Sequence, residues 1–552
     1  MLLAQDNAPT PVPTPKPAHP RLILPDNELP RLQALPRESA QARKLLAELR
    51  REGEKLLNAP PRMPGETRRE MERVYLFGLL YRLEHEKAYL APAVRALTAL
   101  AESREWASGH LVENAEMTQT LAIGYDWFWP ELKPAERDLL RQAIVTKGLQ
   151  PALAAYQRQS GWVTSAASIN ILVNACVGMA ALAVADEEPE LSAAILKYAV
   201  DSIGRSFTAS GSDGSWLDGP GGWSFATRHG ARFLASLDSV PGMANDAAAL
   251  RGLERAARYR VYSMGPLGRS FGAGTGPESS GGVPEMFWLS RRLHQPAFAW
   301  SEQRELARQS HPDALDLVWY GRDAAPPQGP AWPLDALFPA QQRAFFRGAW
   351  DDPEAIFLGV KGGDNKTSHG RADLGSFMLD ALGVRWALEA ERGIVPNTVA
   401  INAEPQDGAA EAHIVSHEFT PGLAWVALDL TRAYAGKAKF WQRRIGLAQR
   451  EAVLIEDRVR ATEPVEVVWS MLTDAEIAFG GQSALLNKGS ALLAAEILTP
   501  RHAVFDVVPA GTNKRRLVAS IGEKKADVDL NILLTPYKAG QPRPKITARF
   551  PE

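Results

Sequence analysis

The chain of 552 residues has little that would cross-link it, carry it across a membrane or charge it strongly. Its one cysteine, Cys176, allows no intrachain disulfide and no metal site built on several thiolates. No stretch approaches the roughly 18 uninterrupted apolar residues of a membrane span. The formal net charge is -2 and the basic residues form no long run, so the composition gives no reason to expect nucleic acid or an anionic membrane surface as a partner.

Residues 1–19 read as a leader or linker. Proline recurs from Pro9 to Pro20, which is typical of a semi-rigid spacer. The start lacks the basic segment and long apolar segment of a secretory signal. We interpret the chain as a periplasmic or secreted protein whose signal has been removed, with a cytoplasmic protein carrying a disordered leader as the alternative.

Residues 20–335 are predicted to be helical. Apolar residues recur at three- and four-residue spacing from Arg21 to about Leu293, and the signal fades through the prolines near residue 326. The clearest segments are 74–83, 116–127, 170–184, 228–237 and 285–293. Helix follows helix without βαβ alternation and without a Rossmann or P-loop signature. The pattern predicts a large all-α domain of stacked hairpins or a toroid.

Residues 336–552 change character. Segments such as 343–350, 355–361, 424–430, 452–459 and 526–534 are short and apolar and carry aromatic or β-branched residues, which reads as strands. They follow each other at intervals of about ten residues without helices between them, which predicts an antiparallel β-sandwich.

The stretch 366–382 combines polar and apolar parts. His369, Arg371 and Asp373 occupy alternate positions, so an extended chain would place them on one face. Phe377 and Leu379 would then anchor the second half of the stretch in the core. The alternative is a surface turn ahead of a core strand.

Several motifs, in order from residue 19 to about 460, resemble the heparinase II/III-like polysaccharide lyases. The segments that carry the resemblance are His19-Pro-Arg-Leu-Ile-Leu, 116–127 ending in Tyr-Asp-Trp, Asn170-Ile-Leu-Val-Asn, the Gly-rich loop 213–223, His369-Gly-Arg-Ala-Asp-Leu-Gly-Ser-Phe and Asn397-Thr-Val-Ala-Ile-Asn.

The resemblance implies a fold and an activity. The fold is an N-terminal incomplete (α/α) toroid followed by a C-terminal antiparallel β-sandwich. The activity is β-elimination on a uronic-acid-containing polysaccharide, in a cleft between the helical and β domains. The partner would be an acidic polysaccharide or oligosaccharide.

This sequence departs from the family at the residues that matter for metal and proton transfer. Arg371, Glu389 and Pro396 stand where zinc-bearing members have His, Asp and His. Proline has no ligating side chain and arginine stays a cation, so we expect no zinc at that place and no other cofactor. The family's tyrosine positions are occupied by Gly222, Phe225 and His229, and Gln119 replaces a frequent histidine.

Carried over residue by residue, the resemblance makes His369, His229 and Arg371 the candidate catalytic residues. His369 and His229 would transfer protons, and Arg371 would neutralise the substrate carboxylate. The candidate substrate-binding residues are Asn170, Gln119, Glu116, Trp216, Trp223, Arg228 and Tyr434, with Tyr434 also a fallback acid. Each has an ordinary structural alternative, such as a helix cap for Asn170, core packing for the tryptophans and a strand end for Tyr434.

Two other functions stay open at the level of the sequence. Helical toroids also house glycoside hydrolases, which need paired carboxyl groups, and Asp213, Asp218, Glu116 and Glu278 are available. A relative that binds glycans without cleaving them would also explain the lost zinc positions and tyrosines.

Overall fold

The computed structural model describes residues 19–60, 66–104, 106, 110–209, 212–216, 219–238, 240, 247–271, 282–309, 311–366, 372–389 and 397–551. The chain divides into two compact units. The first comprises Met1–Ser210, Ser224–Glu254 and Gly281–Ala325, and the second comprises Gly211–Trp223, Arg255–Ser280 and Pro326–Glu552. The second unit therefore takes in two segments from within the helical region, and its last segment begins ten residues before residue 336.

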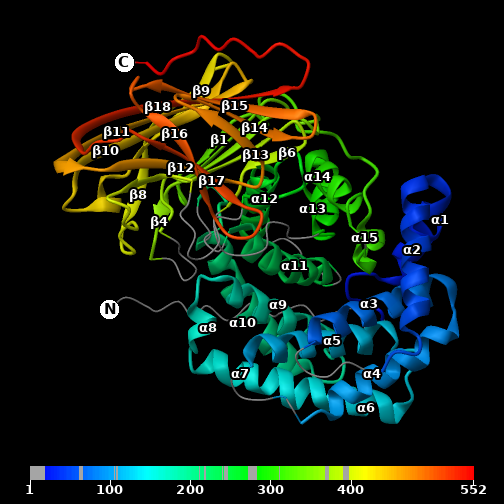
Figure 1. The fold of residues 1–552 in the computed structure, drawn as a ribbon. Helices are drawn as coiled ribbons and strands as arrows, with labels where there is room; N and C mark the ends of the chain where they lie inside the picture. The colour runs from blue at the N-terminus through cyan, green and yellow to red at the C-terminus, as the bar shows by residue number, and fades with distance from the viewer. Residues whose placement is uncertain are drawn as a thin grey trace, which may run out of the picture. The chain divides into compact units, whose positions relative to one another are not determined.

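The first unit is built from helices that follow one another along the chain (Figure 1). They are α1 (Leu29–Glu38), α2 (Ala40–Leu56), α3 (Thr67–Glu84), α4 (Leu90–Glu102), α5 (Leu111–Trp127), α6 (Pro134–Ala143), α7 (Gln150–Gln157), α8 (Gly161–Thr164), α9 (Ser168–Ala183), α10 (Pro189–Ala209), α11 (Gly219–Leu237), α12 (Ala247–Ser263), α13 (Glu285–Leu293), α14 (Pro296–Leu306) and α15 (Ala314–Trp319). Short turns η1 (Asp26–Glu28), η2 (Lys87–Tyr89) and η3 (Ile144–Leu149) lie between them. The parts of α11 before Ser224 and of α12 after Glu254 count with the second unit.

Helices α5 and α9 form the centre of the first unit. Helix α5 is buried at every position from Ala115 to Trp127, and it packs against α3, α4 and α9. Two glycines allow close packing. A Cβ on Gly124 would collide with the Leu97 side chain, and one on Gly178 would collide with the Phe233 ring. Both helices are enclosed by other helices, and α5 therefore buries polar residues such as Glu116 and Asp126 as well as apolar ones.

The helix boundaries follow local sequence signals. Pro134 occupies the first turn of α6, where its missing N–H costs nothing. Helix α13 covers the predicted segment 285–293. The sequence signal fades after that segment, yet α14 and α15 follow. Pro296 begins α14, where its missing N–H costs nothing.

The second unit is an antiparallel β-sandwich with three sheets. Its strands are β1 (Ala336–Phe338), β2 (Arg343–Arg347), β3 (Phe357–Lys361), β4 (Gly363–Asp364), β5 (Phe377–Ala381), β6 (Val384–Ala387), β7 (Val399–Ile401), β8 (Glu411–Phe419), β9 (Leu423–Asp429), β10 (Ala438–Ala448), β11 (Ala452–Val465), β12 (Val467–Thr473), β13 (Glu476–Gly480), β14 (Ser483–Lys488), β15 (Ala491–Thr499), β16 (Val504–Pro509), β17 (Arg515–Ser520) and β18 (Lys525–Lys538), with the 3-10 turn η4 (Thr431–Tyr434) before β10.

The sheet orders show how the chain folds back on itself. One sheet runs β1-β2-β3-β5-β6, a second runs β13-β14-β15-β18-β11-β10-β9-β8-β4, and a third runs β16-β17-β12-β7. Long central strands such as β11 and β18 pair from Val453↔Leu534 to Arg460↔Asp527. Inward-facing apolar residues of the three sheets share one core, which includes Trp386, Trp441 and Trp469. Helices followed by an antiparallel sandwich confirm the predicted fold class.

No helix among the described residues is long and apolar enough to cross a membrane.

Candidate functional site

The best-defined polar cluster in the first unit joins α5 to α11. Glu116 and Gln119 lie three residues apart on α5, so they share one face of the helix. His229 of α11 meets both. Its Nδ1 lies 2.8 Å from Gln119 Oε1, and its Nε2 lies 3.7 Å from Glu116 Oε1. Three of the predicted site residues are thus brought together.

The bond from His229 to Gln119 fixes the tautomer of the imidazole. An amide oxygen accepts, so Nδ1 carries the proton in the neutral ring. The other nitrogen, Nε2, is buried and has no hydrogen-bond partner. Burial lowers the pKa of His229 to about 4, and nearby arginines, including Arg232, add to that effect against the pull of Glu116. At neutral pH the ring is therefore uncharged and presents a lone pair toward Glu116.

Glu116 is held ionised by its neighbours. Burial would raise its pKa, but the charged neighbours of the carboxylate, Arg68 among them, outweigh burial and lower it. Arg68 donates from Nη2 and Nε to Glu116 Oε1, at 3.2 and 3.3 Å. The Arg68 side chain is 46% exposed while that of Glu116 is 5% exposed. Arg68 therefore connects the buried carboxylate with the solvent.

Aromatic and charged side chains surround the Arg68 guanidinium. This group lies 5.1 Å from the centre of the Phe225 ring, which meets the His229 ring edge-on. Arg228, another predicted binding residue, lies 3.8 Å from Glu72. Burial raises the pKa of Glu72. The site thus presents two arginines and two carboxylates around one neutral histidine.

Cys176 of α9 also contacts the cluster. Its Sγ lies 3.3 Å from Gln119 Oε1 and 3.6 Å from His229 Nδ1. Burial raises the pKa of this thiol well above its usual value. It stays protonated and is a packing group rather than a nucleophile.

Asn170 lies in a different environment, although it belongs to the same unit. Its amide nitrogen donates to the backbone oxygens of Trp162 and Val163 and to Ser202 Oγ, at 2.8 to 3.0 Å. The side chain is fully buried. These contacts tie α9 to α8 and α10. The predicted helix-cap alternative is wrong, because Asn170 lies inside α9 and the N-cap is Ala167; a role in substrate binding stays a prediction.

Trp216 and Trp223 belong to the second unit and are buried, and Trp223 lies in α11, so the predicted loop 213–223 is helical at its end. Trp216 is 4% exposed and Trp223 is 0% exposed, and the Arg260 guanidinium lies 5.2 Å from the Trp223 ring. Asp213 in this loop accepts from Ser215 N and Ser215 Oγ with one oxygen, and from Ala340 N with the other. Packing and turn formation account for these contacts, and a role in sugar binding stays a prediction.

Tyr434 lies at the end of η4 in the second unit. Its hydroxyl donates to the backbone oxygen of Glu404 at 2.9 Å, and burial raises its pKa to about 12. A phenol held in this way is a poor proton donor at neutral pH. The predicted strand end is also wrong, because β9 ends at Asp429 and Tyr434 lies in η4.

The stretch 366–382 is described in part. His369 and Arg371 lie outside the described residues, as do Pro396, Asp218 and Glu278. Asp373 forms a buried ion pair with Lys361. The turn after it contains Gly375 at φ +78°, and Arg443 Nη1 donates to the Gly375 oxygen at 2.7 Å. Asp373 thus supports a turn, and β5 then enters the core.

The zinc position of the resembling family does not suit a metal here. Proline offers no ligand atom at 396 and arginine offers a cation at 371, whatever conformation they take. Glu389 alone leaves a single carboxylate from that set. We therefore derive no catalytic step through zinc at this position.

Sequence reasoning missed Arg68. It is one of 62 basic residues, and no spacing or motif marks it. Its place beside Glu116 depends on α3 packing against α5, which a single sequence does not reveal.

The comparisons with known proteins bear on the fold. No family model matches the chain, and no curated protein matches it. Among solved structures, a heparinase III matches with TM-score 0.62 and 14% identity, over 85% of this chain and 77% of its own. A mutant of heparan sulfate lyase HepC from Pedobacter heparinus matches with TM-score 0.60 and 13% identity, over 88% and 79%. A chondroitin AC lyase variant from Streptomyces coelicolor A3 matches with TM-score 0.60 and 14% identity, over 93% and 83%.

These likenesses confirm that the resemblance read from the motifs holds for the fold. The chain shares with these lyases the toroid followed by the sandwich.

Proposed function

We propose that this protein is a polysaccharide lyase that cleaves a uronic-acid-containing polysaccharide by β-elimination without zinc. The observation that carries the proposal is the neutral His229, whose unpartnered Nε2 faces Glu116, in a fold shared with lyases of heparan sulfate and chondroitin. The proposed substrate is an acidic polysaccharide or oligosaccharide.

The elimination needs three catalytic functions. The uronate carboxylate must be neutralised, a base must take the C5 proton, and an acid must protonate O4 as the C4–O4 bond breaks. The electron pair left by the C5 proton forms the C4–C5 double bond of the product.

In the first unit, His229 Nε2 is the proposed base. It is neutral and its lone pair has no partner. A uronate bound beside it would raise the pKa of the imidazole, because a nearby anion favours the imidazolium. The proton accepted from C5 would then be available for return to O4. Glu116 would stabilise the imidazolium as it forms.

Arg68 and Arg228 are the proposed groups for the substrate carboxylate. Arg68 is half exposed and lies next to the buried pair. An arginine can bind a carboxylate through two parallel N–H bonds. His369 and Arg371 remain predicted contributors to proton transfer and neutralisation, and the cleft between the domains also stays a prediction.

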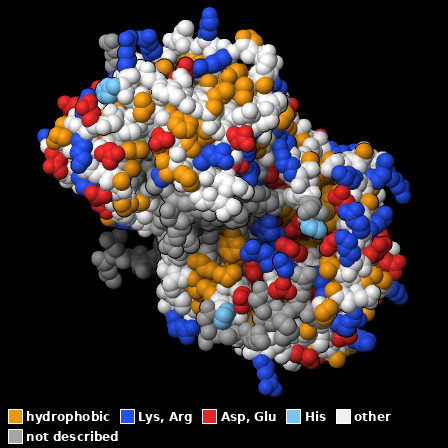
Figure 2. All heavy atoms as spheres, in the orientation of Figure 1, with side chains coloured by type: hydrophobic (Ala, Val, Ile, Leu, Met, Phe, Trp, Pro, Cys, Tyr) orange, Lys and Arg blue, Asp and Glu red, His pale blue; other side chains and the backbone are white. Residues whose placement is uncertain are grey.

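The face drawn in Figure 2 shows basic and acidic side chains mixed, rather than one long basic track. Together with the net charge of -2, this mixture favours a substrate of modest charge density over a heavily sulfated one. We further propose that the protein works in the periplasm or outside the cell, where such polysaccharides occur.

The proposal is tested by incubating the purified protein with a panel of acidic polysaccharides, with and without a chelator. A lyase raises the ultraviolet absorbance by forming the unsaturated uronate, and we expect this signal to persist in chelator. New reducing ends without that absorbance would identify a hydrolase. Retardation in affinity electrophoresis without any cleavage would identify a glycan-binding protein. Loss of activity in chelator would contradict the metal-free mechanism.

The role of His229 is tested on the substrate that the panel identifies. His229→Gln is expected to lower kcat by about 100-fold or more, the usual contribution of general acid–base catalysis. The control is His110→Gln, because His110 is exposed and pairs with Glu113 at the surface. Equal activity of His229→Gln and the wild type, with both folded by circular dichroism, would remove His229 from the mechanism.

A further inference from the structure

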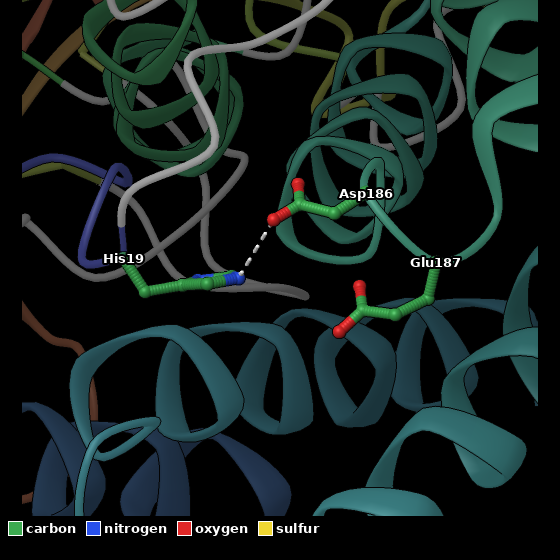
Figure 3. A group of neighbouring side chains, drawn as sticks. All are labelled: His19, Asp186 and Glu187. Carbon is green, nitrogen blue, oxygen red and sulfur yellow. Dashed lines mark ion pairs between the residues drawn. The ribbon is translucent and has the colours of Figure 1, made fainter.

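A second buried histidine of the first unit lies among carboxylates (Figure 3). His19 stands at the start of the described chain, and Asp186 and Glu187 lie in the turn between α9 and α10. One ligand atom from each of the three side chains can be chosen so that all lie within 4.8 Å of one another. The picture shows the three side chains pointing toward a common centre.

The orientation of His19 is fixed by a carboxylate on its far side. Nδ1 lies 2.6 Å from Asp126 Oδ1. A carboxylate accepts, so Nδ1 carries a proton, and Nε2 of the neutral ring has a free lone pair. The imidazole also stacks on Trp129 at 5.0 Å between ring centres. An aspartate behind a histidine is the arrangement that orients and strengthens histidine ligands in metal sites.

The lone pair is buried and has no hydrogen bond. The His19 side chain is 2% exposed, and Nε2 has no hydrogen-bond partner. Its neighbour, Asp186 Oδ2, lies 3.7 Å away. That distance is too long for a hydrogen bond. An unsatisfied buried nitrogen costs stability, so it calls for an explanation.

The two carboxylates are held in place by other residues. Arg21 makes a two-pronged ion pair with Asp186, in which Nη2 lies 2.6 Å from Oδ2. The Tyr125 hydroxyl donates to Glu187 Oε1 at 2.7 Å. Three carboxylates, those of Asp126, Asp186 and Glu187, therefore surround His19, and Arg21 is the cation that pairs with Asp186.

The distances between the ligand atoms of His19, Asp186 and Glu187 would fit a transition-metal ion if the side chains moved slightly closer together. Zinc binds histidine nitrogen and carboxylate oxygen at about 2.0 to 2.2 Å, which separates neighbouring ligand atoms by about 3.3 Å in a tetrahedron. The 3.7 Å between His19 Nε2 and Asp186 Oδ2 is close to this. Glu187 is exposed and can move inward. An imidazole with two carboxylates suits zinc or manganese better than calcium, which prefers oxygen ligands throughout.

We propose that His19, Asp186 and Glu187 bind one divalent transition-metal ion, of the Zn²⁺ class, with water completing the coordination. This place belongs to the helical unit and shares no residue with the zinc position at 371, 389 and 396. The ion would cross-link the start of the toroid to the turn after α9, and so stabilise the folded state without taking part in cleavage.

The competing explanation is a set of ion pairs without metal, in which His19 lies between Asp126 and Asp186. The two explanations differ in whether the protein binds metal with defined stoichiometry.

The test is titration of ZnCl₂ into untagged, chelator-treated full-length protein, followed by calorimetry. We expect one equivalent to bind in the wild type. His19→Gln and Glu187→Gln are each expected to weaken binding by at least tenfold, since each removes a ligand. The control His110→Gln removes an exposed histidine that pairs with one glutamate, and we expect it to bind as the wild type does. MnCl₂ and CaCl₂ titrations are expected to rank manganese above calcium.

Glu187→Gln keeps the test decisive if His19→Gln fails to fold, because Glu187 is exposed. The proposal is overturned if no zinc binds with defined stoichiometry, or if both ligand variants bind it as the wild type does. It is also overturned if added zinc leaves the thermal stability of the metal-free protein unchanged. The lyase proposal is tested separately, by turnover in chelator. The failure of one proposal can therefore be told apart from the failure of the other.

Discussion

His19 and His229 are two buried histidines of the helical unit with almost the same local geometry. In each, Nδ1 is held by an oxygen, at 2.6 Å from Asp126 and 2.8 Å from Gln119. In each, Nε2 has no hydrogen-bond partner and lies 3.7 Å from a carboxylate oxygen.

They differ in what holds Nδ1 and in the charges around the ring. The partner of His19 is a carboxylate, and two further carboxylates face its Nε2 side. The partner of His229 is a neutral amide, and Arg232 and Arg228 add positive charge nearby. An electron-rich setting prepares His19 for a cation. The positive charges near His229 disfavour its imidazolium form, so its lone pair stays available to accept a proton from the substrate. The environment, rather than the residue type, thus assigns the role.

The largest expected effect comes from the group that holds His19. Asp126 is fully buried and accepts from His19 Nδ1, Arg21 N and Leu22 N. Asp126→Asn removes the charge and turns an amide N–H toward a donor, so we expect a loss of about 4 kcal/mol in the free energy of unfolding. Urea denaturation measures it, with Asp138→Asn at an exposed position as the control. A loss below about 1 kcal/mol would show that Asp126 does not hold His19 in place.

Much of this fold could be predicted because periodicity survives in a single sequence. The strand segments 452–459 and 526–534 lie within β11 and β18, which pair with each other. The apolar run 170–184 is α9 within two residues at each end. The region after residue 293 was harder to predict. There the helical signal fades through the prolines near residue 326, although α14 and α15 form before them.

The candidate site could be predicted in part. Glu116 and Gln119 share a face of α5 by their spacing alone, and His229 stood out through the resemblance. Their meeting depends on tertiary packing, as does the approach of Arg68. The acceptors of Asn170 are likewise set by the fold, so the sequence could not choose between its binding and structural roles. The His19 cluster joins residues more than 160 positions apart, and no local sequence pattern predicts such a contact.

The next smaller effect is the loss of folding stability that we expect when acid protonates His229. The pKa of His229 is about 4 in the folded protein against 6.5 as its ordinary value. On acidification the unfolded chain therefore binds the proton first. The stabilisation is present above pH 6.5 and is lost as pH falls toward 4, by about 3 kcal/mol. His229→Gln should flatten this part of the stability curve, measured by denaturation in chelator at several pH values. Parallel curves for the variant and the wild type would contradict a buried neutral His229.

The smallest expected effect comes from a substitution that gives His229 the same kind of Nδ1 partner as His19. Gln119→Glu gives His229 Nδ1 a carboxylate partner, as Asp126 does for His19. An adjacent negative charge favours the imidazolium, so the pKa of His229 should rise from about 4 toward 6.5. Histidine proton resonances followed by NMR against pH measure this, with His229→Gln identifying the signal. Gln142→Glu supplies the same change of charge at an exposed position and should leave that resonance where it was. If the pKa of His229 stays near 4 in Gln119→Glu, then burial alone sets it, and the identity of the Nδ1 partner is not what distinguishes the two histidines.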